Sequence, residues 1–267
     1  MPSERIYCWE ALDVSHPLFH AAERLYENTQ HPDERIPWGW IARSVKGRTQ
    51  WRPGTWGKHL VLAADGLAPD VEGITGADWK PEPDEHAVSD RLAGFAYGVH
   101  LPDFGGYVCY VGVDDRFRRR GVGTRLFEQC FKLFAADAHS ADEPLPCVVW
   151  ESRKPAAGDG DAAWKLWDAR VNLFERVGGL WLDGIELQTP NYAESDGPPV
   201  PLQLFVKPVE QREYDTPSLI GLAAGLLERV YKTAPGDPLY DRTVTPHGPP
   251  RLRPATDAAR RKKRAAV

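Results

Sequence analysis

The stretch that decides the fold runs from Gly106 to Ala136 and reads GYVCYVGVDDRFRRRGVGTRLFEQCFKLFAA. Its first eight residues are mostly apolar, β-branched or aromatic, as in a buried β-strand. A polar loop rich in arginine follows, and apolar residues then recur at helical spacing. These apolar positions are Val122, Leu126, Phe127, Cys130, Phe131 and Phe134. The stretch therefore predicts a strand, a short turn and an amphipathic helix, in that order.

The turn before this helix has the composition of an anion-binding site. Gly121 and Gly123 let the backbone approach a ligand closely, because they carry no Cβ. The first N–H groups of a helix lack partners within the helix, and the helix dipole adds a partial positive charge there. A phosphate group is therefore the expected ligand. The alternative is an ordinary strand-to-helix turn with a solvated basic loop.

Val113 followed by Arg118-x-x-Gly121-x-Gly123 resembles the acyl-CoA signature of the GNAT superfamily of N-acyltransferases, V-x-x-x-x-[QR]-x-x-G-x-[GA]. The resemblance implies an α/β (α+β) GNAT fold, a mixed central sheet with helices on both faces and a splayed parallel strand pair that binds acyl-CoA. It also implies acetyl-CoA as co-substrate, with the pyrophosphate on the turn amides and pantetheine along the strand. The implied cofactor-binding residues are Val111, Val113, Arg118, Arg119, Arg120, Gly121, Val122, Gly123 and Thr124.

The residues for proton transfer are less well defined. The family tyrosine that protonates the CoA thiolate corresponds to Phe174, which has no proton to give, and a common pantetheine-binding asparagine corresponds to Trp167. The positions that often supply a base from the central strand hold Tyr107 and Cys109. Their reference pKa values of about 10 and 8.5 make both poor bases at neutral pH. Glu151, at the end of the next strand, is the third candidate and can take a proton through a water, although a solvated glutamate is the alternative.

The segment before the second strand holds candidate acceptor-site residues. His31 to Pro37 predicts a proline-containing turn ahead of a tryptophan-rich helix. By the resemblance, Glu34, Trp38 and Trp40 lie over the acceptor side of the cleft, and aromatic packing between two helices is the alternative. No metal site is expected, since the one close histidine pair, His16 and His20, is interpreted as a surface pair.

The remaining elements follow from alternation, helical spacing and turn residues. One GNAT-like domain is expected over residues 1–210, a C-terminal helix over 211–232 and a disordered basic, proline-rich tail over 233–267. A long loop is expected over Gly66 to Asp90. Helices are expected after a Ser15 cap, over Ala162–Val177 and from Thr216. The expected strands, besides the central one, are Arg5–Ala11, His59–Ala64, Leu92–His100, Pro146–Glu151, Leu180–Leu187 and Leu202–Val206.

Composition restricts the class of partner. With 42% hydrophobic and 27% charged residues, the chain has the make-up of a globular protein, and its net charge of −5 argues against nucleic acid as a partner. The sequence has no apolar run near the roughly 20 residues that span a bilayer, and no signal-peptide core. A cytoplasmic location is therefore expected, with reduced core thiols at Cys8, Cys109, Cys130 and Cys147.

Two functions follow from the resemblance. The favoured one is an N-acetyltransferase that moves an acetyl group from acetyl-CoA to an amine, by direct attack in a ternary complex. The alternative is a non-catalytic GNAT-fold sensor or scaffold that binds acyl-CoA. The intact turn from Arg118 to Gly123 favours cofactor binding, whereas Phe174, Tyr107 and Cys109 favour the non-catalytic alternative. The sequence leaves open both the acceptor, a small molecule or a protein, and the oligomeric state.

Overall fold

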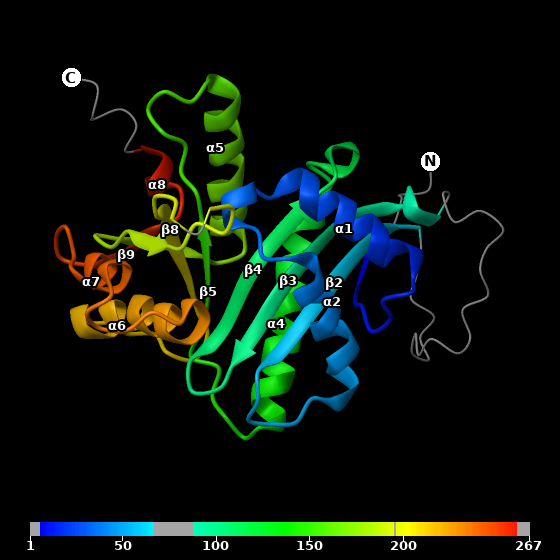
Figure 1. Cartoon of the computed structure of the whole chain (residues 1–267), viewed down its shortest axis with the longest axis horizontal. Coiled ribbons are helices and arrows are strands. Elements are labelled where there is room, and N and C mark those ends of the chain that lie inside the picture. Colours follow the sequence, from blue (N-terminus) through cyan, green and yellow to red (C-terminus); the bar gives the residue numbers. More distant parts are fainter. Residues whose placement is uncertain (1–5, 67–87, 195, 261–267) are drawn as a thin grey trace. The chain divides into compact units, whose positions relative to one another are not determined.

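The structure is a computed structural model that describes residues 6–66, 88–194 and 196–260 (Figure 1). The chain divides into two compact units, Met1–Leu145 and Pro146–Val267. The expected domain of residues 1–210 contains the first unit and part of the second. A division at residue 210 stays a prediction. The expected loop from Gly66 to Asp90 falls largely outside the described residues.

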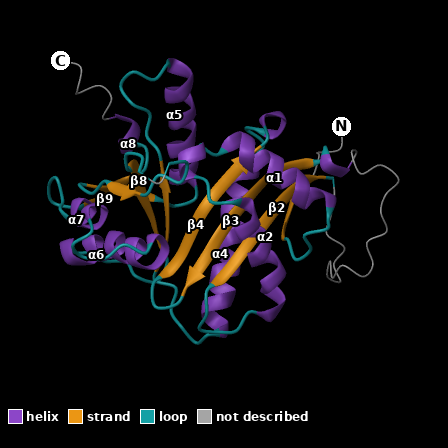
Figure 2. Ribbon diagram, viewed as in Figure 1, coloured by secondary structure: helices purple, strands orange, loops and turns teal. Residues whose placement is uncertain are grey.

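The first unit is built on an antiparallel sheet in which neighbours in sequence are neighbours in space. The strands appear in orange in Figure 2. Strand β3 is buried along its whole length, because both faces of the sheet are covered. The strands are β1 (Ile6–Glu10), β2 (Gly57–Asp65), β3 (Leu92–Leu101) and β4 (Gly105–Val113).

Helices cover both faces of this sheet. A Cβ at Gly94 of β3 would meet Leu126 and Val122 of α4, so absence of a side chain lets α4 pack closely. Phe95, the next residue, points to the other face and packs against Tyr26 of α1. The helical elements are α1 (Pro17–Thr29), η1 (Pro32–Glu34), α2 (Trp38–Gly47), η2 (Arg48–Gln50), η3 (Asp115–Phe117) and α4 (Val122–Ser140).

The predicted strand, turn and helix of residues 106–136 are confirmed. The apolar stripe of α4 is buried as expected, except that Phe131 is only half-buried. The expected Ser15 cap of α1 is wrong. His16 is the N-cap, and its Nδ1 accepts a hydrogen bond from the Leu18 amide (3.1 Å). The Ser15 hydroxyl instead donates to Asp13 Oδ1 (2.8 Å), so it does not cap the helix.

The second unit has its own antiparallel strand pairs, in the order β5-β8-β6-β9, with β7 on β8. The expected strand from Leu180 to Leu187 is two strands, because Gly184 (φ 96°) makes a turn between them. The strands are β5 (Cys147–Ser152), β6 (Leu180–Asp183), β7 (Leu187–Thr189), β8 (Val200–Pro208) and β9 (Arg251–Pro254). The helical elements are α5 (Asp161–Arg176), α6 (Thr216–Leu226), a π-helical turn (Leu227–Tyr231), α7 (Pro238–Val244) and α8 (Asp257–Arg260).

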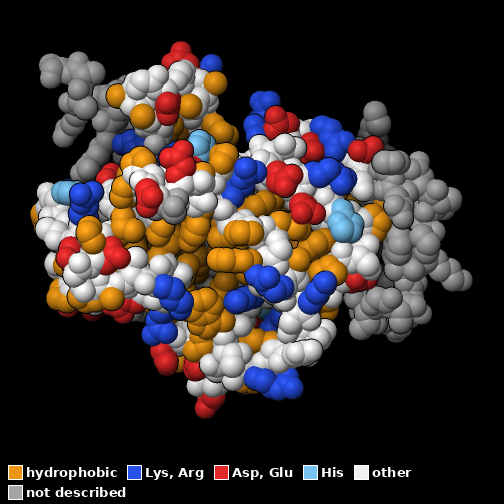
Figure 3. All heavy atoms as spheres, in the orientation of Figure 1, with side chains coloured by type: hydrophobic (Ala, Val, Ile, Leu, Met, Phe, Trp, Pro, Cys, Tyr) orange, Lys and Arg blue, Asp and Glu red, His pale blue; other side chains and the backbone are white. Residues whose placement is uncertain are grey.

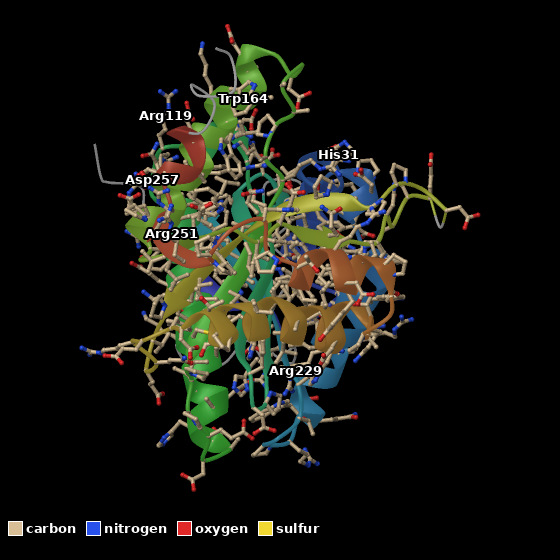
Figure 4. All side chains as sticks on the ribbon, turned by 90° about the vertical axis from the view of Figure 1, so that its left-hand side faces the viewer. His31, Arg119, Trp164, Arg229, Arg251 and Asp257 are labelled. Carbon is tan, nitrogen blue, oxygen red and sulfur yellow. The ribbon has the colours of Figure 1, made fainter. Side chains whose placement is uncertain are left out.

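The expectation of a disordered tail after Thr233 is wrong for residues 233–260. This segment contains α7, β9 and α8, and β9 pairs with β6 in antiparallel register. Ala255 and Ala258 are fully buried. Arg253 Nη1 lies 3.3 Å from Asp183 Oδ2, and its Nε lies 3.2 Å from Asp257 Oδ2. The alanines of this segment are buried and Arg253 forms ion pairs, so residues that are typical of a disordered tail are part of a folded structure here. Figure 4 labels Arg251 and Asp257 on this segment.

Removal of this segment is expected to destabilise the chain. Truncation after Thr233 uncovers the β6 edge and the buried contacts of Ala255 and Ala258. We expect the melting temperature to fall by roughly 5 °C or more, since about 2 kcal/mol shifts a domain of this size by that amount. A chain ending at Arg260 is the matched control, measured by the same calorimetric scan. Equal melting temperatures for the two shortened chains would contradict the expectation.

Two global properties bear on partners. Among the helices of the described ranges, none has the length and apolarity needed to cross a membrane. In the view of Figure 3, acidic and basic side chains are interspersed among the described residues.

Candidate functional site

The turn between β4 and α4 brings uncapped backbone N–H groups together. Arg119 (φ 63°) and Gly121 (φ 80°) are both left-handed, and Gly121 is the N-cap of α4 without a side chain to cap it. The first bond into the helix runs from the Arg125 N–H to the Gly121 carbonyl (3.1 Å). The N–H groups of residues 122–124 precede that bond, so the helix itself supplies no acceptor for them. The turn therefore presents several donors to one anion.

Space for a ligand exists at Gly121. A Cβ built there would have no atom within 4 Å, whereas a Cβ at Gly112 of β4 would collide with the Phe95 ring and Thr29 Oγ1. The left-handed backbone at Gly121 also suits glycine, because a Cβ is disfavoured at positive φ. Open space beside uncapped amides is the arrangement that a phosphate group needs, so these residues fit the pyrophosphate of CoA.

The arginines of the turn are largely engaged with carboxylates. Arg118 Nη2 lies 2.6 Å from Asp115 Oδ1, and Arg120 Nη2 lies 3.7 Å from Asp65 Oδ2. Arg119 is exposed, and Figure 4 shows its side chain at the surface. The guanidinium groups add positive potential around the turn, whose helix N-terminus has no side-chain cap.

A β-bulge interrupts β4 at Cys109. Tyr97 of β3 pairs with Tyr110, and the next residue, Gly98, pairs with Val108. Cys109 therefore has no opposite residue, and the backbone of a bulge residue is left out of the ladder. No turn-forming residue stands at this position, so the bulge could not be predicted from the sequence. Cys109 is half-buried, whereas Tyr107 is only 3% exposed.

The remaining residues predicted on β4 are half-buried. Val111 and Val113 lie opposite Ala96 and Gly94 of β3. The Val111 carbonyl accepts a hydrogen bond from Gln30 Nε2 (3.1 Å), so one of the backbone groups expected to face pantetheine already has a partner. The sequence did not indicate this contact between the end of α1 and β4.

Buried tyrosines attach the η1 segment to β4. The Tyr110 hydroxyl donates to the Glu34 carbonyl (2.8 Å) and accepts from the Ile36 N–H (3.2 Å). The Tyr26 hydroxyl donates to the Ile36 carbonyl (2.9 Å). Burial raises the pKa of Tyr26 and Tyr110, so both remain neutral donors at physiological pH. These hydrogen bonds fix the backbone around Glu34 relative to the central strand.

The tryptophans after this segment differ from one another. Trp38 is 9% exposed and packs on Phe19 and Tyr26, so aromatic packing accounts for it. Trp40 is 50% exposed, and its place over the acceptor side stays a prediction.

A close group of polar side chains lies on η1. His31, Asp33 and Glu34 bring potential ligand atoms within 4.8 Å of one another. His31 is exposed, as Figure 4 shows, and a polar turn explains the group without an ion. Of the histidine pair considered in the sequence, His16 caps its helix and His20 is exposed.

Glu151 belongs to the second unit, on β5, and is half-buried. Its Oε1 accepts a hydrogen bond from the Tyr231 hydroxyl (2.8 Å). The sequence did not indicate Tyr231, which lies 80 residues further along the chain.

Phe174 and Trp167 belong to the aromatic core of the same unit. The Phe174 ring lies 4.7 Å from Phe205 and 5.7 Å from Trp150 between ring centroids. Trp167 is 1% exposed and lies 6.2 Å from Phe205 by the same measure. The interpretation of Phe174 as a packing residue is confirmed.

Comparison with known proteins identifies the fold. Residues 69–142 match the family model described as Acetyltransferase (GNAT) family. A putative acetyltransferase of the GNAT family from Bacteroides thetaiotaomicron superposes with a TM-score of 0.50 at 18% identity, covering 86% of this chain and 99% of that one. No curated protein matches the chain in a sequence comparison. The resemblance to the GNAT superfamily is therefore confirmed, and the chain has the α/β GNAT fold.

More distant likenesses are of the same kind. A GNAT-family acetyltransferase from Staphylococcus aureus Mu50 has a TM-score of 0.44 at 10% identity, with 77% of this chain and all (100%) of that chain covered. An aminoglycoside 6'-N-acetyltransferase complexed with coenzyme A has a TM-score of 0.44 at 16% identity, with coverages of 79% and 99%.

The predicted splayed pair would be made by β4 of the first unit and β5 of the second, and it stays a prediction.

Proposed function

We propose that this protein is an N-acetyltransferase that transfers an acetyl group from acetyl-CoA to an amine acceptor within a ternary complex. The observation that carries the proposal is the uncapped N-terminus of α4, with left-handed Arg119 and Gly121 and open space beside Gly121. It lies within the segment that matches the GNAT family model.

The proposed roles combine this geometry with the family resemblance. The amides of Arg119 to Thr124 bind the pyrophosphate, with Arg118 and Arg120 adding positive potential. As the resemblance implies, the backbone of Val113 and Val111 lies along pantetheine, and the Val111 carbonyl keeps its hydrogen bond to Gln30. The amine nitrogen attacks the thioester carbonyl carbon, so that a C–N bond forms, the C–S bond breaks and the CoA thiolate leaves. The amine must lose a proton in this process. Free amines of lysine type have a pKa of roughly 10.4, so a base is needed near neutral pH.

Glu151 is the proposed base among the three candidates. A carboxylate is ionised at neutral pH, whereas a tyrosine and a thiol are mostly protonated there. Tyr107 is almost fully buried, and the Cys109 thiol lies 4.0 Å from the Tyr107 carbonyl. We expect Glu151→Gln to lower kcat by about 100-fold, the lower end of a general-base contribution, while the affinity for acetyl-CoA is unchanged. Loss of affinity in this variant would instead assign Glu151 to cofactor binding.

The test of the function itself has two stages. Isothermal titration measures the binding of acetyl-CoA, and release of the CoA thiol is then followed against a panel of small amines and peptide N-termini. Turnover with any amine supports the enzyme. Binding without turnover would favour the sensor or scaffold, and absence of binding would contradict both. None of the four cysteines is in a disulfide bond, which suits a reducing compartment, and the cytoplasm stays the proposed location.

A further inference from the structure

The carboxylate of Glu151 is held by a residue from the C-terminal part of the chain. The Tyr231 hydroxyl donates a hydrogen bond to Glu151 Oε1 over 2.8 Å, and both side chains are half-buried. A hydrogen bond to a charged carboxylate is worth more than one between neutral groups, and it restricts the carboxylate to fewer rotamers. The contact therefore selects one orientation for Glu151.

The backbone that delivers Tyr231 is irregular. Helix α6 ends at Leu226, and the chain continues as a π-helical turn, Leu227–Tyr231, whose C-cap Lys232 is left-handed (φ 58°). Both the Lys232 and the Thr233 N–H groups donate to the Leu227 carbonyl, the latter over 3.2 Å. Leu227 is fully buried and anchors the turn. A π-helical turn and a non-glycine residue at positive φ both cost free energy relative to a regular helix, and such features concentrate at functional sites.

We propose that Tyr231 is a positioning residue for Glu151 in the acetyl transfer. This inference rests on the proposed function, because it assigns Tyr231 the task of orienting the proposed base. The phenol stabilises the ionised carboxylate and fixes the direction in which it meets the acceptor amine. The base is then assembled by two parts of the second unit, β5 and the turn after α6. A chain truncated to residues 1–210 would keep Glu151 and lack Tyr231.

The test uses Tyr231→Phe in the full chain, which removes the hydroxyl and keeps the ring. We expect kcat to fall about ten-fold, as for loss of one hydrogen bond to a charged group, with no change in the KM for acetyl-CoA. The acidic limb of the pH–rate profile is expected to move to higher pH, because the carboxylate loses a donor that favours its ionised form. If Tyr231 only stabilised the fold, its replacement would change neither the acidic limb of the pH–rate profile nor kcat per folded molecule.

The chain offers a matched control. The Tyr240 hydroxyl donates to Glu228 Oε1 over 2.9 Å in the same unit, but that pair is exposed. Tyr240→Phe removes the same kind of hydrogen bond and should leave kcat and the pH profile unchanged. In a Glu151→Gln background, Tyr231→Phe should have little further effect, since the two residues act together.

The outcomes separate this inference from the function on which it rests. If the wild type turns over an amine and Tyr231→Phe matches it in kcat and pH profile, the positioning role is overturned and the function stands. A kcat loss explained by a smaller folded fraction, seen as a lower melting temperature, overturns it as well. If the folded wild type turns over no amine, both proposals fall.

Discussion

Replacing His59 by leucine is expected to lower the free energy of unfolding by about 3–5 kcal/mol, the usual cost of removing one partner from a buried ion-pair network. The His59 side chain is fully buried, between Glu10 of β1 and Asp137 of α4. Its Nδ1 lies 2.7 Å from Glu10 Oε1, and its Nε2 lies 2.9 Å from Asp137 Oδ2. Since carboxylates accept, both ring nitrogens must donate, and the imidazole is therefore doubly protonated.

Arg48 completes this network. Its Nε lies 2.8 Å from Glu10 Oε1, and its Nη2 lies 2.8 Å from Asp137 Oδ1. Two cations and two carboxylates thus face each other with no net charge. His100, which is also buried nearby, has a pKa lowered by burial and adds no further charge at neutral pH. In His59→Leu, two carboxylates share a single guanidinium in a low-dielectric site, which explains the size of the expected effect.

The same network sets a pH window for stability. The pKa of His59 is raised because its two carboxylate partners outweigh the effect of burial. The contribution of His59 to stability is therefore complete below its pKa in the unfolded state, about 6.5. It is lost as pH rises through the pKa in the folded state. The pKa of Asp137 is lowered by hydrogen bonds from His59 and Arg48. The contribution of Asp137 to stability is complete above its pKa in the unfolded state, about 3.9, and is lost as pH falls through the pKa in the folded state. The network therefore stabilises the fold most between about pH 3.9 and pH 6.5.

Denaturant unfolding from pH 4 to 9 measures this dependence for the wild type and His59→Leu. His20→Leu is the control, since His20 has a side chain that is 57% exposed. Gly57→Ala tests the same site differently, because its Cβ would lie 1.6 Å from Asp137 Oδ2 and must displace that carboxylate. If the difference between wild type and His59→Leu does not shrink above pH 7, the protonated histidine is not the source of the stability.

The sequence predicted best where local chemistry alone decides the structure. Residues 106–136 alternate and then repeat at helical spacing, and a glycine stands where the backbone needs a positive φ, so β4, the turn and α4 could be inferred directly. The turn lies within one continuous segment, and the candidate phosphate site followed from it.

Features that depend on distant pairing could not be inferred in this way. His59 joins residues from β1 and α4, and Tyr231 contacts Glu151 across 80 residues. The proline- and arginine-rich C-terminal segment has the composition of a disordered tail, yet it forms β9 because the β6 edge offers backbone partners. The β-bulge at Cys109 depends on how β4 pairs with β3, which its own residues do not reveal.

Replacing Gly121 by glutamate is expected to weaken acetyl-CoA binding by at least about 100-fold. The Cβ direction at Gly121 opens onto space without atoms within 4 Å, beside the uncapped N–H groups of α4. A glutamate there occupies that space and places a negative charge against the pyrophosphate. Two like charges about 4 Å apart repel by roughly 4 kcal/mol at an effective dielectric constant of about 20, which is ample for such a loss.

The controls separate this repulsion from backbone strain. Gly121→Ala adds only the left-handed penalty, about 1–2 kcal/mol of stability, and should retain most of the affinity. Gly54 has nearly the same backbone (φ 77°) and also has no atom within 4 Å of a Cβ, but it lies in the loop before β2. Gly54→Glu therefore adds the same charge and a similar backbone strain at a position outside the turn. Its affinity for acetyl-CoA should equal that of the wild type. If titration calorimetry gives Gly121→Glu and Gly54→Glu the same affinity, the anion does not bind at the start of α4, and the acyl-CoA site assigned to this turn is wrong.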